Sequence, residues 1–332
     1  MKKILFAGIC ILIVLFTTSC SNGEKRFVFD GTVQGTYYHI VIYNDDSTGF
    51  RQGFDSIFTC IDNSVSLWVR NSLLSRVNRN ENVILDDIFK DNFIAAQRMN
   101  KLTEGALDIT VGALVKSYGF STQRRTNLSQ RQINDMLKYV GMDKVFISGN
   151  KLIKKYPQTQ IDFNAIAQGY TTDMITKYLD NKGIKSFLID VGGEVYARGL
   201  KPKKEKWKVA IEQPTKSSDE ERSYNATVSL KDESIVTSGS YRKFYEENGV
   251  KYSHTIDPKT GRPVRHSLLS VSVIAKDATT ADGLATSFMV LGLNKSIEFL
   301  QNHKEYSAYF IYSDSNGELK IWYNDSFKNY LN

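Results

Sequence analysis

Apolar residues change their spacing repeatedly along residues 31–332, and no linker interrupts the pattern. Strand-like composition at 35–43 and 186–199 is interspersed with helical spacing at 49–65 and 87–105. Hydrophobic residues make up 41 % of the chain, which is enough for a sizeable core. The pattern predicts one continuous α+β body.

The first nineteen residues have the composition of a signal peptide. A basic "MKK" precedes the apolar "ILFAGICILIVLF", and "TTSC" follows with small residues and a cysteine. This ending resembles a bacterial lipobox and predicts a signal over 1–19, lipid attachment at Cys20 and a tether over 20–30. We therefore expect an exported protein that is lipid-anchored to a bacterial membrane and faces the periplasm. An uncleaved N-terminal anchor is the alternative.

Charge and cysteine content exclude several kinds of partner and site. The formal net charge is +7, and the densest basic run, "KPKKEKWK" at 201–208, is typical of a solvated loop. The sequence contains no organised nucleic-acid surface, whereas a mild basic excess suits an anionic ligand or a membrane surface. With Cys20 lipidated, Cys60 has no partner for a disulfide or a metal cluster, and we expect it to be a small buried residue.

A helix predicted over 278–292 carries polar residues at an informative spacing. Asp282 and Thr286 are four residues apart, so their oxygens share one helical face, and small residues surround them. A carboxylate and a hydroxyl one turn apart form a plausible partial shell for Mg²⁺. The alternative is an ordinary helix start, with an aspartate favoured by the helix dipole and a threonine bonded back to a carbonyl.

Three further segments concentrate polar or conformationally special residues. "DFNAIAQGY" at 162–170 joins a predicted strand to a helix whose N–H groups suit phosphate, although no glycine-rich dinucleotide fingerprint is present. "DVGGEV" at 190–195 permits either a ligand's close approach or a simple bend. In the paired strands predicted around 237–258, Arg242 could meet a phosphate and His254 could move a proton, or His254 could be structural.

These segments occur in an order that resembles the ApbE family, the FAD:protein FMN transferases. The similarity rests on "TSGSYRKFYEENGVKYSHTIDPKTGRPV" with "SVSVIAKDATTADGLATSFMVLG", on "IDFNAIAQGYTTD" and "IDVGGEV", and on the N-terminal "QGTYYHIVIY", "SLWVRNSLLSRVN" and "GALDITVGALVKSYGF". It covers roughly residues 31–325. The resemblance implies a single ApbE-like, T-fold-like domain over 31–332, an α+β body with a mostly antiparallel sheet core and packed helices.

The resemblance also implies an activity. Members of this family use Mg²⁺ to cleave the pyrophosphate of FAD and pass FMN to a threonine or serine hydroxyl of an acceptor protein, releasing AMP. By resemblance, the Mg²⁺ ligands are Asp282, Thr286 and the backbone carbonyl of Ala165. His254 corresponds to the family's histidine beside the bond that is cut, and is expected to be the general base.

The residues that resemblance assigns to FAD binding are spread over the chain. They are Gln34, Trp68, Ala106, Leu107, Asp108, Asp162, Gln168 and Ile256. Tyr241 and Arg242 are expected to shape the same pocket. Gln34 replaces the family's usual methionine, and Gln168 replaces a more common lysine or glutamate, which removes a charge near the nucleotide.

Two other functions use the same residues. A Mg²⁺-dependent FAD pyrophosphatase would use water as the acceptor and would release FMN and AMP. A non-catalytic lipoprotein would only bind and deliver flavin. For the transferase, the resemblance implies an acceptor that is a subunit of a membrane redox complex.

Overall fold

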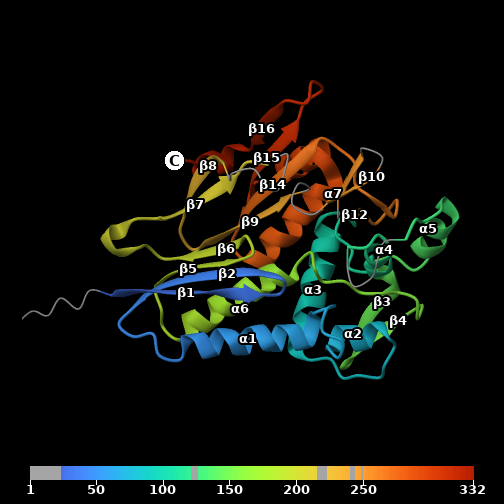
Figure 1. Ribbon diagram of the computed structural model, residues 1–332, viewed down its shortest axis with the longest axis horizontal. Helices are drawn as coiled ribbons and strands as arrows, with labels where there is room; N and C mark the ends of the chain where they lie inside the picture. Colours follow the sequence, from blue (N-terminus) through green and yellow to red (C-terminus); the bar gives the residue numbers. More distant parts are fainter. Residues whose placement is uncertain (1–23, 121–125, 215–222, 240–243, 248–249, 254) are drawn as a thin grey trace, which may run out of the picture.

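An eight-stranded sheet, in which each pair of neighbouring strands is antiparallel, organises the chain (Figure 1). The computed structural model describes residues 24–120, 126–214, 223–239, 244–247, 250–253 and 255–332. In spatial order the strands are β1 (Lys25–Val33), β2 (Thr36–Asn44), β5 (Ser186–Val191), β6 (Glu194–Arg198), β9 (Glu233–Gly239), β14 (Leu268–Ala275), β15 (Ser307–Ser313) and β16 (Leu319–Tyr323). The expected mostly antiparallel α+β body is thereby confirmed.

Helices and small hairpins surround this sheet. The helices are α1 (Phe50–Val65), α2 (Leu73–Asn78), α3 (Asp87–Leu102), α4 (Gly112–Ser117), α5 (Gln130–Leu137), α6 (Ala167–Asn181), α7 (Ala278–Asn302) and α8 (Asp325–Lys328), with short 3₁₀ turns at Met142–Lys144 and Pro202–Lys204. The two-stranded pairs are β3 (Val145–Ser148) with β4 (Lys151–Lys154), β7 (Trp207–Glu212) with β8 (Tyr224–Leu230), β10 (Phe244–Glu247) with β11 (Val250–Ser253), and β12 (Ile256–Asp257) with β13 (Arg262–Pro263).

Alternating side chains give the sheet two buried faces. In β2, Tyr38, Ile40 and Ile42 pack with α1 and α6, whereas Val41 packs on the opposite face with β7 and β8. Figure 1 shows α1 and α6 below the strands β1, β2, β5 and β6, with β7 and β8 above them. The chain therefore forms three layers. Because both faces of a central strand such as β2 are covered, most of its successive side chains are apolar.

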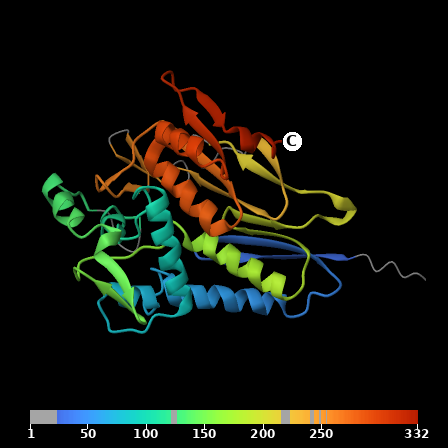
Figure 2. The ribbon, with the colours of Figure 1, turned by 180° about the vertical axis from the view of Figure 1, so that it is seen from behind.

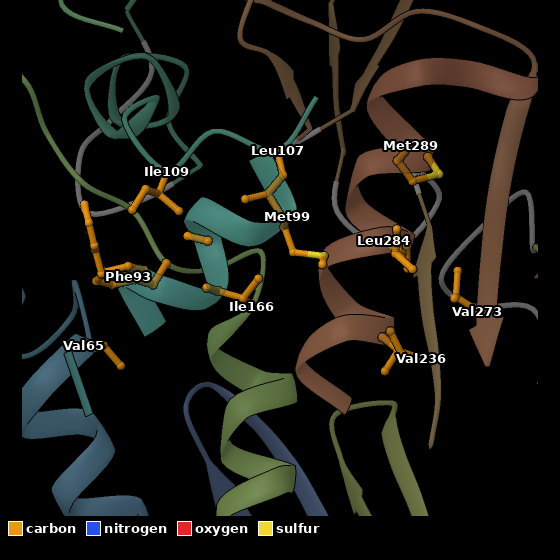
Figure 3. Close-up of a cluster of buried hydrophobic side chains, with 14 of the residues drawn as sticks. Val65, Phe93, Met99, Leu107, Ile109, Ile166, Val236, Val273, Leu284 and Met289 are labelled. Carbon is orange, nitrogen blue, oxygen red and sulfur yellow. The ribbon is translucent and has the colours of Figure 1, made fainter. Parts of the chain in front are cut away.

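The largest core cluster joins α3 and α7 to the second half of the sheet. In Figure 3, Met99 reaches from α3 toward α7, and Leu284 extends from the other side of α7 toward Val273. Gly283 permits this approach, because a Cβ placed there would lie 2.8 Å from Met99 Cγ. Figure 2, the view from behind, shows α3 and α7 side by side on this face.

The structure corrects the part of the expected tether that covers residues 25–30. Lys25 already belongs to β1. Each residue of that strand pairs with a residue of β2, and the Phe29 side chain of β1 is buried. These residues form a strand because they pair with β2, and the sequence alone does not show that pairing. The exposed, charged beginning of β1 therefore has the composition of a linker. Residues 1–23, which include the predicted signal and Cys20, lie outside the described residues.

Cys60 is exposed, and the expectation that it is buried was wrong. It lies on α1 but away from the face formed by Phe50, Phe54, Phe58 and Ile61, which packs into the core.

Three element boundaries also differ from the prediction. The sequence "SQRQINDMLKYVG" predicts a helix over 129–141 with Ser129 as its N-cap; Ser129 does cap α5, but the helix ends at Leu137. Residues 161–163, expected as a strand, form none. The segment "SIEFLQNH" at 296–303 predicts a second helix after the one at 278–292, but the two join in α7, with a kink at Gly292, whose φ is 74°. In the described part of the chain, no helix is both long and apolar enough to cross a membrane.

Candidate functional site

A cavity of about 130 Å³ opens where α4, α7, β12 and the loops before α4 and α6 meet. Its walls come from stretches that are far apart in the sequence, and its apolar floor is continuous with the core through Leu107 and Ile109. The sequence-predicted residues that line it are Ala106, Leu107, Asp108, Asp162, Ala165, Ile256 and Thr286. Folding thus brings seven of the predicted residues to one place.

Two buried carboxylates face this cavity. Asp108 Oδ1 accepts the Thr110 backbone N–H at 2.8 Å, and Asp162 Oδ1 accepts the Asn164 backbone N–H at 2.8 Å. The Asp162 N–H donates to the Ile109 carbonyl at 2.7 Å, which joins the two segments. Burial raises the pKa of Asp108, and it raises the pKa of Asp162 to about 6. Both side chains are held in place as acceptors for hydroxyl or amino donors of a ligand.

Of the three residues predicted to hold Mg²⁺, two line the cavity, and Asp282 is not among the lining residues. Ala165 and Thr286 line it, and Asp282 lies one helical turn before Thr286 on α7. Among the described residues, Asp282 makes one hydrogen bond, accepted at Oδ2 from the Gly169 N–H at 3.1 Å, and has no basic partner. Burial raises the pKa of Asp282 well above its usual range.

This environment fits a divalent cation. A buried carboxylate without a basic partner gains most from a bound positive charge, and the neighbouring hydroxyl and carbonyl are hard oxygen donors. Within the described ranges, no three His, Cys, Asp or Glu side chains form a metal cluster. The predicted set contains one such side chain, Asp282, so it does not require a cluster.

Asp173 is a functional candidate that sequence reasoning missed. Its two carboxylate oxygens accept the N–H groups of Ala278 at 2.8 Å and Thr279 at 2.9 Å, at the beginning of α7. Asp282, in return, accepts an N–H from the beginning of α6. Each helix therefore presents a carboxylate to the first turn of the other, where free N–H groups need acceptors. Burial raises the pKa of Asp173 to about 6.

Gln34 and Gln168 gather beside the beginning of α6 and do not line the cavity. Gln34, in the β1–β2 turn with φ 52°, lies with Nε2 3.1 Å from Thr171 Oγ1. Gln168 lies against Gly192, where an added Cβ would come within 2.9 Å of its Nε2. The Gly-Gly bend after β5 therefore gives close approach of the backbone to this side chain.

Trp68 lies in a different hollow. This second cavity, of about 320 Å³, is shared with Arg70, Arg79 and Lys116. Gly112 and Lys116 of α4 face it, whereas the preceding Val111 and Val115 face the first cavity. The α4 segment thus separates Trp68 from the other predicted residues.

His254, Tyr241 and Arg242 lie outside the described residues. The strands expected on either side of the "EENG" turn are present, because β10 and β11 pair antiparallel from Phe244–Ser253 to Glu247–Val250. Thr255 and Ile256, which follow His254 in the chain, both line the first cavity.

Several lining residues carried no chemical signal in the sequence. Among them are Phe120, Pro258 and Val290, which are apolar and contribute shape. Asp173 did carry a signal, because it lies one turn after Gly169 inside the helix that begins "AQGYTTD".

Comparison with known proteins places this geometry in a family context. The ApbE family model matches residues 34–310. A protein of Haemophilus influenzae named FAD:protein FMN transferase is 33 % identical over 96 % of this chain and 95 % of its own length. A protein of the same name from Vibrio cholerae is 32 % identical over 96 % of both chains.

Solved structures agree in fold. The flavin transferase ApbE from Vibrio cholerae superposes with a TM-score of 0.83 at 32 % identity, covering 93 % of this chain and 100 % of that one. The apo form of the flavinyl transferase ApbE of Pseudomonas stutzeri gives 0.82 at 28 % identity, covering 93 % and 97 %.

Proposed function

Because the chain belongs to the ApbE family, we propose that it is a FAD:protein FMN transferase, an enzyme that moves FMN from FAD onto an acceptor protein. One observation supports this function most. Residues assigned to FAD and Mg²⁺ by resemblance come from separate segments, and seven of them line a single cavity. Helices and loops with no related role would not be expected to converge on that set.

The reaction exchanges one phosphorus–oxygen bond for another. The hydroxyl oxygen of an acceptor threonine or serine bonds to the FMN phosphorus, the bond from that phosphorus to the bridging oxygen breaks, and AMP leaves. We assign removal of the hydroxyl proton to His254, whose ring can act as a base near neutral pH.

The residues in and beside the cavity bind FAD, exclude water and would hold Mg²⁺. Asp108 and Asp162 accept hydrogen bonds from donors of FAD, and the apolar walls at Leu107 and Ile256 exclude water from a bound ring. Asp282, Thr286 and the Ala165 carbonyl would hold Mg²⁺, which when bound neutralises charge on the diphosphate oxygens.

Trp68 presents an aromatic face that suits stacking with a flat ring, next to the basic side chains of Arg70 and Lys116. Since this hollow lies across α4 from the cavity, we assign to Trp68 an outer part of an extended ligand. A dinucleotide such as FAD is long enough to contact two neighbouring hollows.

The acceptor and the location complete the proposal. We propose that Cys20 is lipidated, that the domain faces the periplasm, and that the acceptor is a subunit of a membrane redox complex. The signal-like beginning of the chain supports this location.

Hydrolysis is the competing reaction at the same site, with water in place of the acceptor hydroxyl. Incubation with FAD and Mg²⁺, with and without a candidate acceptor, separates the functions. Mass spectrometry of the acceptor is expected to show one added FMN on a threonine or serine. Release of free FMN and AMP with an unmodified acceptor would establish the pyrophosphatase, and unchanged FAD would leave only flavin binding.

A further inference from the structure

The loop between β6 and β7 is a concentrated source of positive charge. Residues 201–208 contain five lysines and one glutamate, and Glu205 is paired with Lys201, with Nζ and Oε2 3.2 Å apart. Lys203, Lys204 and Lys206 are exposed and form no ion pair within the described residues. Lys203 and Lys204 have positive φ angles of 71° and 62°, a conformation that non-glycine residues adopt rarely.

Strand register brings this loop to the end of the molecule where the body begins. Lys25 pairs with Asn44, the neighbouring Tyr43 pairs with Ser186, and Phe187 pairs with Arg198. The beginning of β1 and the end of β6 therefore lie at one end of the sheet, three strand spacings or about 14 Å apart. Figures 1 and 2 both show the β6–β7 loop and the start of β1 at this end.

Basic side chains outnumber unpaired acidic side chains around the β6–β7 loop. Lys182 and Lys185, in the turn between α6 and β5, are exposed, and Gly199 packs against the Lys185 carbonyl, which brings this turn next to the loop. Among the nearby acids, Asp180 and Asp232 already pair with Arg198. The exposed acids Glu24, Asp45 and Asp46 adjoin the Lys25–Asn44 pair, three strand spacings from the end of β6.

We propose that this basic end, defined by Lys182, Lys185, Lys203, Lys204 and Lys206, contacts the anionic lipid headgroups of the membrane to which the chain is anchored. The inference rests on the proposed lipid attachment at Cys20. Five residue steps separate Cys20 from Lys25, and a fully extended chain of that length reaches at most about 18 Å. So short a connection holds this end of the sheet close to the headgroups, where basic side chains experience the negative surface potential.

Such a contact would orient the enzyme. In both ribbon views α4 and β12, which contribute to the cavity, lie toward the opposite end of the long axis from the start of β1 (Figures 1 and 2). A basic end held on the bilayer therefore turns the cavity away from the lipid, toward the part of an acceptor that projects from the membrane.

Lysine accessibility tests this orientation in the full chain. The purified protein is reconstituted in vesicles of phosphatidylcholine alone or with about 30 % phosphatidylglycerol, and acetylation of each lysine is timed by peptide mass spectrometry. Each basic side chain near an anionic membrane surface strengthens binding to that surface about fivefold. Acetylation of Lys203, Lys204 and Lys206 is therefore expected to slow by about threefold or more with anionic lipid. Lys151 and Lys155, in and after β4, supply the unchanged reference.

A charge-reversed variant and salt complete the test. Lys203→Glu/Lys204→Glu/Lys206→Glu is expected to abolish the lipid-dependent protection of Lys182 and Lys185, whereas Lys151→Glu/Lys155→Glu preserves it. Raising salt to about 0.5 M, where screening acts within about 4 Å, removes the protection in the wild type. Equal acetylation in both vesicle types, or protection that survives in the charge-reversed variant, overturns the proposal.

The mass of the purified chain reports acylation independently of the labelling. Charge-dependent protection of a chain that carries no lipid would support the basic end while refuting the anchor at Cys20. FMN transfer measured in detergent is expected to be the same for wild type and the charge-reversed variant, so loss of enzymatic function is separable from loss of lipid contact.

Discussion

Gly169 and Asp282 are in direct contact where α6 meets α7. The Gly169 N–H donates to Asp282 Oδ2 at 3.1 Å, and a Cβ placed on Gly169 would lie 2.4 Å from the Ala278 carbonyl oxygen and 2.9 Å from Asp282 Cβ. No side chain fits between the two helices at this point. The position of the proposed Mg²⁺ ligand on α7 is therefore set by the absence of a side chain on α6.

Gly169→Ala is expected to force α6 and α7 apart. The atoms that block the added methyl group belong to the Ala278 backbone, which cannot rotate away, and overpacking of this kind costs about 1–3 kcal/mol in the free energy of unfolding. FMN transfer should fall as well, because Asp282 moves relative to Ala165. Urea denaturation and a transfer assay measure the two effects.

Gly53→Ala is the matched control for this change. It also adds a methyl group to a helical glycine, but the nearest atoms belong to the end of the Tyr178 side chain, which can move. If Gly169→Ala were as stable as Gly53→Ala and fully active, the tight α6–α7 contact would not position the site.

Periodicity and local spacing predicted the parts of this architecture that depend on neighbouring residues. The faces of α1 and α3 followed from apolar spacing, and the shared face of Asp282 and Thr286 followed from their four-residue separation. The resemblance then identified which loops would meet, and seven of the residues that it names line one cavity.

Contacts between distant segments could not be predicted in this way. Asp173 and Ala278 are 105 residues apart, and Gly169 and Asp282 are 113 apart, so no local pattern indicates that each helix caps the other. The resemblance assigned Trp68 to FAD binding, but nothing in the sequence indicated that α4 lies between Trp68 and the first cavity. Such relationships depend on helix packing, which one sequence does not reveal.

Asp162 is expected to make stability depend on pH. Burial raises its pKa from 3.8 to about 6, so between about pH 4 and 6 the unfolded chain loses this proton before the folded chain does. The contribution of Asp162 to the free energy of unfolding is therefore fully present below about pH 4 and is lost as the pH rises through about 6. Asp162→Asn, which keeps the oxygen that accepts the Asn164 N–H, lacks this loss.

Urea denaturation of both proteins at about pH 4 and about pH 7.5, without FAD, measures the effect. Relative to wild type, Asp162→Asn should gain roughly 1–3 kcal/mol between the two pH values. The wild type measured in parallel accounts for the other titrating groups. Parallel stability curves would show that Asp162 is ionised normally in the folded chain.

Lipid attachment is expected to require Cys20. Cys20→Ala should either release the mature protein from membranes or block removal of the signal, since the thiol that carries the lipid is absent. Fractionation and the mass of the purified chain distinguish these two results, and Cys60→Ala, at an exposed site on α1, serves as the control. A Cys20→Ala protein of mature size that still sediments with membranes would contradict the assignment.

His254→Ala is expected to lower FMN transfer by about 10²–10⁴-fold, the usual range for a lost general base. FAD binding should change little, because the proton is moved only during the reaction. Transfer rate and FAD affinity are measured separately, with His303→Ala as a control at a histidine that pairs with Glu305 on the surface. Full activity in a folded His254→Ala protein would assign the proton transfer to another group.

Asp282 and Thr286 are expected to set the Mg²⁺ dependence of transfer. Asp282→Ala removes the single formal charge of the proposed ligand set, and since loss of groups that only support a metal ligand costs about 10–100-fold, this change should cost at least that much. Thr286→Val keeps the shape but removes the hydroxyl, and a milder shift toward higher Mg²⁺ concentration is expected. Ser287→Ala is the matched control, because Ser287 is the next residue of α7 but donates to the Gly283 carbonyl at 2.6 Å inside the core. The measurement is the FMN transfer rate of the four proteins as a function of Mg²⁺ concentration. If the Asp282→Ala curve coincided with the curves of wild type and Ser287→Ala, Asp282 would not be a metal ligand. Its role would then be to accept the hydrogen bond from the beginning of α6.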